Sequence, residues 1–320
     1  MSVSADYLLR CAAETGFPAG TLERVVRLGE IAADIARDPR LGEALALKGG
    51  TALNLGFGPP RRLSIDLDYN YVARLDRASM LAERPQIEAA VVRIAERQGF
   101  RVQASADAFA GRKLHLHYAA ALDPAGVVHI DINYLHRLPL DAATIMALWQ
   151  PGELDQPSVH AVGLRELLIG KLLALLDRGS PRDAWDVANL PTAICGTLRE
   201  PEFRRLFLAM AATLDLPLPR YGQGRLSGAL TEKVVADQLG PLLSGDERLD
   251  AGKLAAAAWE ELAPLVHLSK DETAFFAAVD QGDLQLELLF PADAAEAERL
   301  ALHPALQWKI TNARRKPPGR

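Results

Sequence analysis

The chain has 320 residues, 49% of them hydrophobic and 24% charged, as is typical of soluble globular proteins with room for two domains or lobes. Its net charge of −5 excludes binding to polyanions through bulk charge, so contact with RNA requires a local basic patch. Two cysteines imply no disulfide framework, and neither a bilayer-spanning apolar run nor the basic-then-apolar order of a signal peptide is present, which favours a cytoplasmic protein.

The first predicted elements are two helices separated by a glycine turn. Apolar residues at helical spacing predict a helix over residues 22–37. A second helix is expected after Gly49-Gly50, with Thr51 near its N-cap and the Gly/Pro-rich residues 56–60 at its end. A glycine turn that opens a helix supplies free backbone N–H groups, which suit the phosphates of a ligand.

A strand with two aspartates follows. Within residues 62–70 polar and apolar side chains alternate, which predicts a strand with one polar face. That face carries Ser64, Asp66, Asp68 and Asn70. Two carboxylates side by side are costly unless a cation lies between them, and Mg²⁺ prefers oxygen ligands beside phosphates. The pattern therefore favours metal-assisted phosphoryl or nucleotidyl transfer, although an edge strand with solvated aspartates would show the same alternation.

Three further elements are predicted downstream: a helix over residues 85–98 and strands over residues 113–118 and 128–134. The turn signal at residues 123–126 joins the two strands in an antiparallel hairpin. With both apolar faces on the core, Asp131 is expected close to His115 or His117. The histidines of this hairpin also suggest a zinc site, but no Cys or Glu completes such a set.

A lobe boundary is expected near residue 150, because residues 138–159 are irregular and rich in Pro and Gly. The sequence thus divides into residues 1–150, with the predicted strands, and residues 151–320, which are mainly helical. The second part begins with a leucine-rich helix over residues 164–178, interrupted by Lys171.

A second cluster of charged residues spans that helix and the next one, which begins at Pro181. Its members follow the order Lys-x6-Arg-x3-Arg-Asp-x2-Asp and are Lys171, Arg178, Arg182, Asp183 and Asp186. Lys171 and Arg178 share a helix face, as do Asp183 and Asp186. Two structural alternatives remain open: a lysine extending from an apolar face towards water, and Asp183 acting with Ser180 as a capping box.

These motifs carry a resemblance to a known family. Lys48-Gly49-Gly50-Thr51-Ala52-Leu53-Asn54-Leu55, followed by Arg-x-Ser-x-Asp-x-Asp at residues 62–68, resembles the nucleotidyltransferase superfamily and, in its finer form, the AbiEii/AbiGii toxins, which are related to the MenT toxins. The resemblance implies an α/β protein. Its nucleotidyltransferase lobe would have a small mixed, mostly antiparallel sheet, and a mainly helical C-terminal lobe would complete the NTP cleft.

The resemblance also implies roles for individual residues. Asp66 and Asp68 would bind Mg²⁺ or Mn²⁺, and Asp131 would be the third carboxylate, either as a metal ligand or as the general base. The phosphates of the NTP would be positioned by Lys48, Gly49, Gly50, Thr51 and Ser64. Lys171 would neutralise phosphate charge. The nucleotide or RNA would be contacted by Arg178 and Arg182, with Asp183 and Asp186 holding the lysine or sensing the nucleotide.

By the same resemblance, the chain would be a toxin that transfers a nucleoside monophosphate from an NTP to a tRNA 3′ end and releases pyrophosphate. A cognate antitoxin is the expected protein partner, and no membrane is involved. Two alternatives are a protein nucleotidyltransferase that adds AMP or UMP to a hydroxyl, and a non-catalytic NTP-binding regulatory module. A phosphotransferase is less well supported, because no Walker A motif or kinase catalytic loop is present.

The remaining features carry less chemistry. Arg61-Arg62 and Arg314-Arg315-Lys316 are candidate RNA-binding patches, although the second also suits a solubilising end. Ser269 and Glu272 predict a capping box, and Trp259 and Trp308 are interpreted as packing residues.

Overall fold

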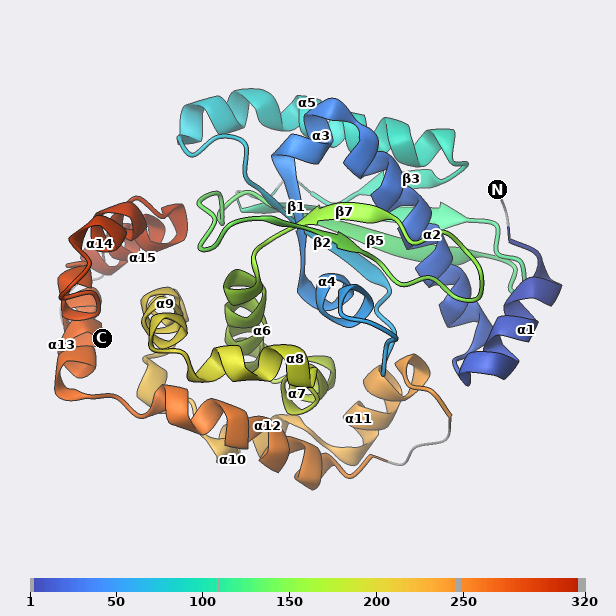
Figure 1. Ribbon diagram of the computed structural model, residues 1–320. Coiled ribbons are helices and arrows are strands. Elements are labelled where there is room, and N and C mark those ends of the chain that lie inside the picture. Colours follow the sequence, from blue (N-terminus) through green and yellow to red (C-terminus); the bar gives the residue numbers. More distant parts are fainter. Residues whose placement is uncertain (1–2, 107, 109, 246–248, 316–320) are drawn as a thin grey trace. The chain divides into compact units, whose positions relative to one another are not determined.

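The computed structural model describes residues 3–106, 108, 110–245 and 249–315 (Figure 1). It divides into two compact units. Within the described residues, unit 1 comprises residues 3–163 and 236–245, and unit 2 comprises residues 164–235 and 249–315. Residues 151–163 thus group with unit 1, because a strand at residues 158–161 pairs with the sheet of that unit.

Unit 1 is built on one seven-stranded sheet in the order β3-β4-β5-β2-β1-β7-β6. The strands are β1 (Leu45–Lys48), β2 (Asp66–Tyr71), β3 (Arg101–Ala104), β4 (Gly111–Tyr118), β5 (Gly126–Asn133), β6 (Thr144–Ala147) and β7 (Ser158–Ala161). The pairs β2–β5 and β1–β7 are parallel, and the other four are antiparallel. The prediction of a mixed, mostly antiparallel sheet is therefore confirmed.

Five helices of unit 1 precede or interrupt the sheet: α1 (Ala5–Thr15), α2 (Ala19–Arg37), α3 (Pro39–Ala44), α4 (Gly49–Gly56) and α5 (Arg77–Arg97). Helix α2 packs on β2, β5 and β7, whereas the short α4 packs on β1 and β2 (Figure 1). The chain returns to this unit through the end of α11 (Glu232–Leu239) and η3 (Gly240–Leu242). Tyr69, Tyr71 and Tyr134 are buried in the core, where the Tyr71 hydroxyl donates to Glu83 of α5 and the Arg84 guanidinium of α5 lies over the ring of Tyr134.

Four local predictions need correction. The strand expected over residues 62–70 is β2, which begins only at Asp66, so Ser64 precedes the strand. The helix expected at residues 85–98 begins at Arg77, because the Asp76 side chain caps it by accepting the N–H of Ser79, and Pro85 lies inside it. The helix expected after Gly50 begins at Gly49 with Lys48 as its N-cap, which places Thr51 in its first turn. The stretch expected to be irregular contains β6 and β7, which only their pairing with each other and with β1 reveals.

All the regular secondary structure in the described residues of unit 2 is helical, which confirms the prediction of a mainly helical second part (Figure 1). Its longer helices are α6 (Leu164–Arg178), α7 (Pro181–Ala188), α9 (Pro201–Ala211), α12 (Ala251–Val266), α13 (Lys270–Asp280), α14 (Ala294–Ala301) and α15 (Pro304–Arg315). Its shorter ones are α8 (Thr192–Cys195), η1 (Gly196–Arg199), η2 (Leu218–Arg220), α10 (Gln223–Ala229) and η4 (Leu286–Leu288). Helix α12 packs on α7 and α10, and α6 packs on α7 and α9.

Helices α13 and α15 of unit 2 test two further predictions, the capping box at Ser269 and the basic residues near the C-terminus. The capping box of Ser269 and Glu272 at the start of α13 is confirmed. Arg314 and Arg315 end α15, whereas Lys316 and the tail after it lie outside the described residues. None of the described helices is both long enough and apolar enough to cross a membrane.

Candidate active site

The register of the sheet brings the three predicted carboxylates together. Asp66 and Asp68 alternate along β2 and share its more exposed face, whereas Leu67 and Tyr69 are buried on the other. Strand β5 runs parallel to β2, with Asp131 opposite Asp68. Paired residues on neighbouring strands lie about 5 Å apart between Cα atoms, so Asp131 flanks the Asp-x-Asp pair, as the family resemblance implied.

Asp66 and Asp131 each have a nitrogen partner that the sequence did not predict. His129 Nδ1 lies 3.0 Å from Asp66 Oδ1, and Lys113 Nζ lies 3.0 Å from Asp131 Oδ2. Both partners are side chains of the β4–β5 hairpin, where Lys113 faces Asp131 and His115 faces His129. The expected neighbour of Asp131 was His115 or His117. His115 lies one step further along the same face, close enough for the charge of Asp131 to act on it, so that prediction is confirmed for His115. The residue directly opposite Asp131 is Lys113, which only the strand register decides.

The hairpin histidines do not form a metal cluster of their own. His115 and His129 pack edge to face with ring centroids 4.9 Å apart. Partial burial lowers the pKa of His115, and the charges of His129 and Lys113 lower it further. Within the described residues, no group of three or more His, Cys, Asp and Glu side chains has the geometry of a metal site.

The glycine turn lies directly against the carboxylates. Gly49 has φ of +73°, and a Cβ added there would lie 2.4 Å from Asp68 Oδ2. A Cβ on Gly50 would lie 2.9 Å from Ser64 Oγ. Only glycine permits both the backbone conformation and this close approach at residue 49. The first turn of α4 therefore presents its backbone N–H groups, which have no partner inside the helix, beside Asp68.

Two buried side chains hold this turn in place. The Thr51 hydroxyl donates to the backbone carbonyl of Asp66, which ties α4 to β2. Arg62 is also buried, donates to the carbonyl of Leu63 over 2.8 Å, and lies close to Gly50. Arg62 is thus part of the support of the turn rather than of a surface patch with Arg61, which corrects the sequence interpretation.

These residues fit a divalent cation bound together with a substrate. The donors on β2 are carboxylate oxygens, which Mg²⁺ and Mn²⁺ prefer, and Mg²⁺ commonly uses one or two carboxylates and completes its shell with water and substrate phosphates. One oxygen of Asp131 is engaged by Lys113. The arrangement suits an ion shared between protein and nucleotide rather than a closed protein cage.

The second predicted cluster lies in unit 2, where α6 and α7 form a buried ion-pair network. Lys171 Nζ lies 2.9 Å from Asp183 Oδ1 and 2.7 Å from Asp186 Oδ2. These three side chains are 6%, 1% and 0% exposed. Arg178 Nε lies 2.6 Å from Asp183 Oδ2, but the arginine side chain is 60% exposed. The network forms because Gly179, at φ of +60°, ends α6 and lets α7 fold back beside it.

The network resolves the two structural alternatives raised by the sequence. Ser180 makes no side-chain capping bond at the start of α7, so Asp183 is an ion-pair partner rather than half of a capping box. Lys171 does not extend towards water, since its ammonium group is held inside by two carboxylates. Burial by itself raises the pKa of Asp183, but the charges of Lys171 and Arg178 outweigh burial and hold that pKa well below its ordinary value. Arg182, on the same helix, is half-buried.

Comparison with known proteins concerns the family and the fold of the chain. A family model described as nucleotidyl transferase AbiEii toxin of a type IV toxin–antitoxin system matches residues 33–261, which include every site residue named above. Among solved structures, the nucleotidyltransferase toxin MenT4 from Mycobacterium tuberculosis has the same fold, with a TM-score of 0.62 and 17% sequence identity. That match covers 94% of this chain and 99% of MenT4. A search of the curated proteins finds no match.

Proposed function

Because the chain belongs to the AbiEii family of nucleotidyltransferase toxins, we propose that it transfers a nucleoside monophosphate from an NTP to an acceptor hydroxyl and releases pyrophosphate. The observation that supports this most directly is the strand register. Asp131 lies opposite Asp68, two residues along from Asp66, with the backbone of Gly49 against Asp68. Carboxylates and free backbone N–H groups at one place are what transfer between phosphates requires.

In this proposal, the residues of unit 1 bind the phosphates, accept the proton and hold the metal ion. The backbone N–H groups at the start of α4 bind phosphate oxygens, and Lys48 and Ser64 line the same turn. The acceptor oxygen forms a bond to the α-phosphorus as the bond from that phosphorus to the bridging oxygen of the β-phosphate breaks. Asp131 accepts the hydroxyl proton, and pyrophosphate leaves. The chemistry that Mg²⁺ or Mn²⁺ would supply, held by Asp66 and Asp68, is neutralisation of the phosphate charge that develops in this step.

Unit 2 supplies the positive charge in the proposal. The exposed guanidinium of Arg178 is the group in the Lys171 network that can contact phosphate without losing its buried partner. Arg182 is assigned the same task. For Lys171 to contact phosphate, the phosphate has to replace one of its two carboxylates, so we propose that Asp183 and Asp186 set how available this lysine is.

We assign a tRNA 3′ end as the acceptor and a cognate antitoxin as the protein partner. The antitoxin assignment is supported by membership of a toxin–antitoxin family, and the tRNA assignment by the resemblance of the sequence motifs to those of the MenT toxins. Nothing in the carboxylate site distinguishes an RNA hydroxyl from a protein hydroxyl, so the experiment has to offer both.

The test is incubation of the full-length protein with Mg²⁺ or Mn²⁺, total tRNA, lysate protein and each α-³²P-NTP in turn. Asp66→Ala is the inactive variant, and Asp123→Ala, at an exposed turn residue, is the matched control. We expect label on tRNA with one preferred NTP, lost in Asp66→Ala and retained in Asp123→Ala. Label on polypeptide instead would make the chain a protein nucleotidyltransferase. NTP binding without any transfer would leave a regulatory module.

A further inference from the structure

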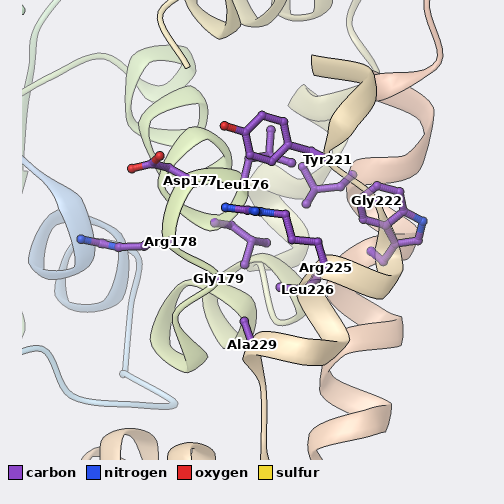
Figure 2. Close-up of a pocket in the computed structure, with 12 residues that line it drawn as sticks. Leu176, Asp177, Arg178, Gly179, Tyr221, Gly222, Arg225, Leu226 and Ala229 are labelled. Carbon is purple, nitrogen blue, oxygen red and sulfur yellow. The ribbon is translucent and has the colours of Figure 1, made fainter. Parts of the chain in front are cut away.

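Unit 2 contains a pocket that shares only Arg178 with the proposed reaction (Figure 2). It encloses about 200 Å³ between the C-terminal end of α6, helix α10 and helix α12. Its floor is apolar and consists of Leu175, Leu176, Leu226 and Leu262. A space of this size suits one flat ring system rather than a long side chain or a whole nucleotide.

The walls of the pocket are aromatic and cationic. The Arg225 guanidinium lies over the ring of Tyr221, 5.4 Å from its centroid, and Figure 2 shows the two side chains next to each other. The Tyr221 hydroxyl accepts a hydrogen bond from the backbone N–H of Leu216, which fixes the ring. Trp259 of α12 lines the same pocket and is only half-buried. The interpretation of Trp259 as a pure packing residue is therefore incomplete.

Charged groups lie at the mouth of the pocket. Asp177 and Arg225 are both exposed. Burial raises the pKa of Tyr221, the hydrogen bond from Leu216 and the charge of Arg225 lower it, and the charges of Asp177 and Asp215 raise it further. Arg178 also lines the pocket, although Figure 2 shows its side chain pointing away from Tyr221 and Arg225. The mouth thus offers the guanidinium of Arg225 and the carboxylate of Asp177.

A nucleobase from a single strand matches these features. Proteins bind unpaired bases by stacking them on aromatic rings and arginine planes, and they bind the adjoining phosphate with positive charge. A carboxylate accepts hydrogen bonds from the exocyclic amino group of cytosine. An aromatic side chain of a protein partner would fill the same space but would bring no anion to Arg225.

We propose that this pocket binds one nucleobase of the RNA acceptor strand, with the ring between Trp259 and Tyr221, Arg225 on the neighbouring phosphate and Asp177 on an amino-bearing base edge. This inference rests on the proposed function only in taking RNA as the acceptor. It also connects the pocket to the charged network. Arg178 lines the pocket and pairs with Asp183, and Lys171 lies seven residues earlier on α6, about 10 Å along the helix axis.

The experiment measures RNA binding apart from transfer. Fluorescence anisotropy of labelled six-nucleotide RNAs is recorded with the full-length protein, in the absence of NTP and divalent cation. Arg225→Glu and Trp259→Leu should weaken binding at least about tenfold, the loss of one base stack or more. Lys253→Glu, an exposed residue on α12 outside the pocket, makes the same charge change as Arg225→Glu and should alter binding less than about twofold, because an isolated exposed charge contributes little.

Two further variants make the result specific. Trp259→Phe keeps a ring and should restore binding that Trp259→Leu loses, which separates stacking from a folding defect. Wild type should bind oligo(C) more tightly than oligo(U), and Asp177→Asn should reduce that preference, because an amide both donates and accepts. Equal binding of oligo(C) and oligo(U) by wild type would exclude the assigned role of Asp177 and with it the proposal as stated.

Some outcomes would overturn the pocket proposal, and others would show whether the pocket proposal or the transferase proposal is the one that fails. Unchanged RNA affinity in Arg225→Glu and Trp259→Leu would overturn it, as would binding of free mononucleotides or of an aromatic peptide, rather than RNA, that depends on Arg225. If wild type labels tRNA while these variants bind normally, the pocket proposal fails and the transferase stands. If the variants lose RNA binding while wild type transfers no label, the transferase fails and the pocket stands.

Discussion

The two units each pair a lysine with an aspartate, but under opposite conditions. In unit 1, the side chains of Lys113 and Asp131 are 47% and 38% exposed. In unit 2, those of Lys171 and Asp183 are 6% and 1% exposed. Exposed pairs contribute about 0–1 kcal/mol to stability, whereas removing one partner of a buried pair costs about 3–5 kcal/mol. The exposed pair of Lys113 and Asp131 in unit 1 can therefore exchange partners at little cost. The buried Lys171 network stabilises the packing of α6 on α7, next to Arg178.

The largest expected effect tests this contrast in stability. Lys171→Met should lower the free energy of unfolding by about 3–5 kcal/mol, because Asp183 and Asp186 would remain buried without their shared cation. Lys113→Met, the same change in the exposed pair, should cost less than about 1 kcal/mol. Urea denaturation of both variants measures the difference, and equal losses would remove the distinction between the two pairs.

The next effect is on activity and concerns a carboxylate of unit 1. Asp68→Asn should slow nucleotide transfer about a thousandfold, equivalent to about 4 kcal/mol at the barrier. Its unfolding free energy should change little, because a half-exposed carboxylate with acidic neighbours stabilises the fold weakly. Transfer of label from α-³²P-NTP and thermal unfolding give the two values, with Asp123→Asn as the control. A variant that unfolds early but still transfers label would reverse the assignment of roles.

A smaller effect is expected where the backbone of the glycine turn touches Asp68. Gly49→Ala should cost about 1–3 kcal/mol from its positive φ, and its Cβ should also displace the Asp68 carboxylate and slow transfer. Gly99→Ala is the matched control, since its φ is +85° but nothing lies within 4 Å of an added Cβ. The excess loss in Gly49→Ala over Gly99→Ala, measured by denaturation and by transfer, isolates the contact with Asp68. Equal losses would show that only the backbone conformation matters.

The smallest effect concerns pH. The pKa of Asp183 is held below its ordinary value, so its contribution to stability is fully present above the unfolded pKa of about 3.9 and is lost as pH falls through the folded pKa. Asp183→Asn should therefore be less stable than wild type at pH 7, and the gap should narrow between about pH 4 and pH 2. Unfolding free energies across this range test it. A gap that stays constant in acid would mean that the carboxylate charge of Asp183 does not stabilise the fold.

Periodic features of the sequence predicted many of the secondary elements. The helix at residues 164–178, the hairpin of β4 and β5 and the capping box at Ser269 are where local patterns put them. Such features depend on side chains a few positions apart in the chain. Strands β6 and β7 escaped prediction because each has four residues, and their pairing partners alone distinguish them from loops.

In the candidate site, too, local relations could be predicted from the sequence and long-range contacts could not. The sequence by itself determined the alternation of Asp66 with Asp68, the glycine pair before them, and the order of charges from Lys171 to Asp186, because these are local relations along one strand, turn or helix pair. Tertiary structure alone decided that Asp131 faces Asp68. It also decided that Lys113 pairs with Asp131 and His129 with Asp66, and that Arg62 is buried beside the glycine turn. Register and burial depend on contacts between residues far apart in the chain, and a one-residue shift of a strand would exchange its two faces.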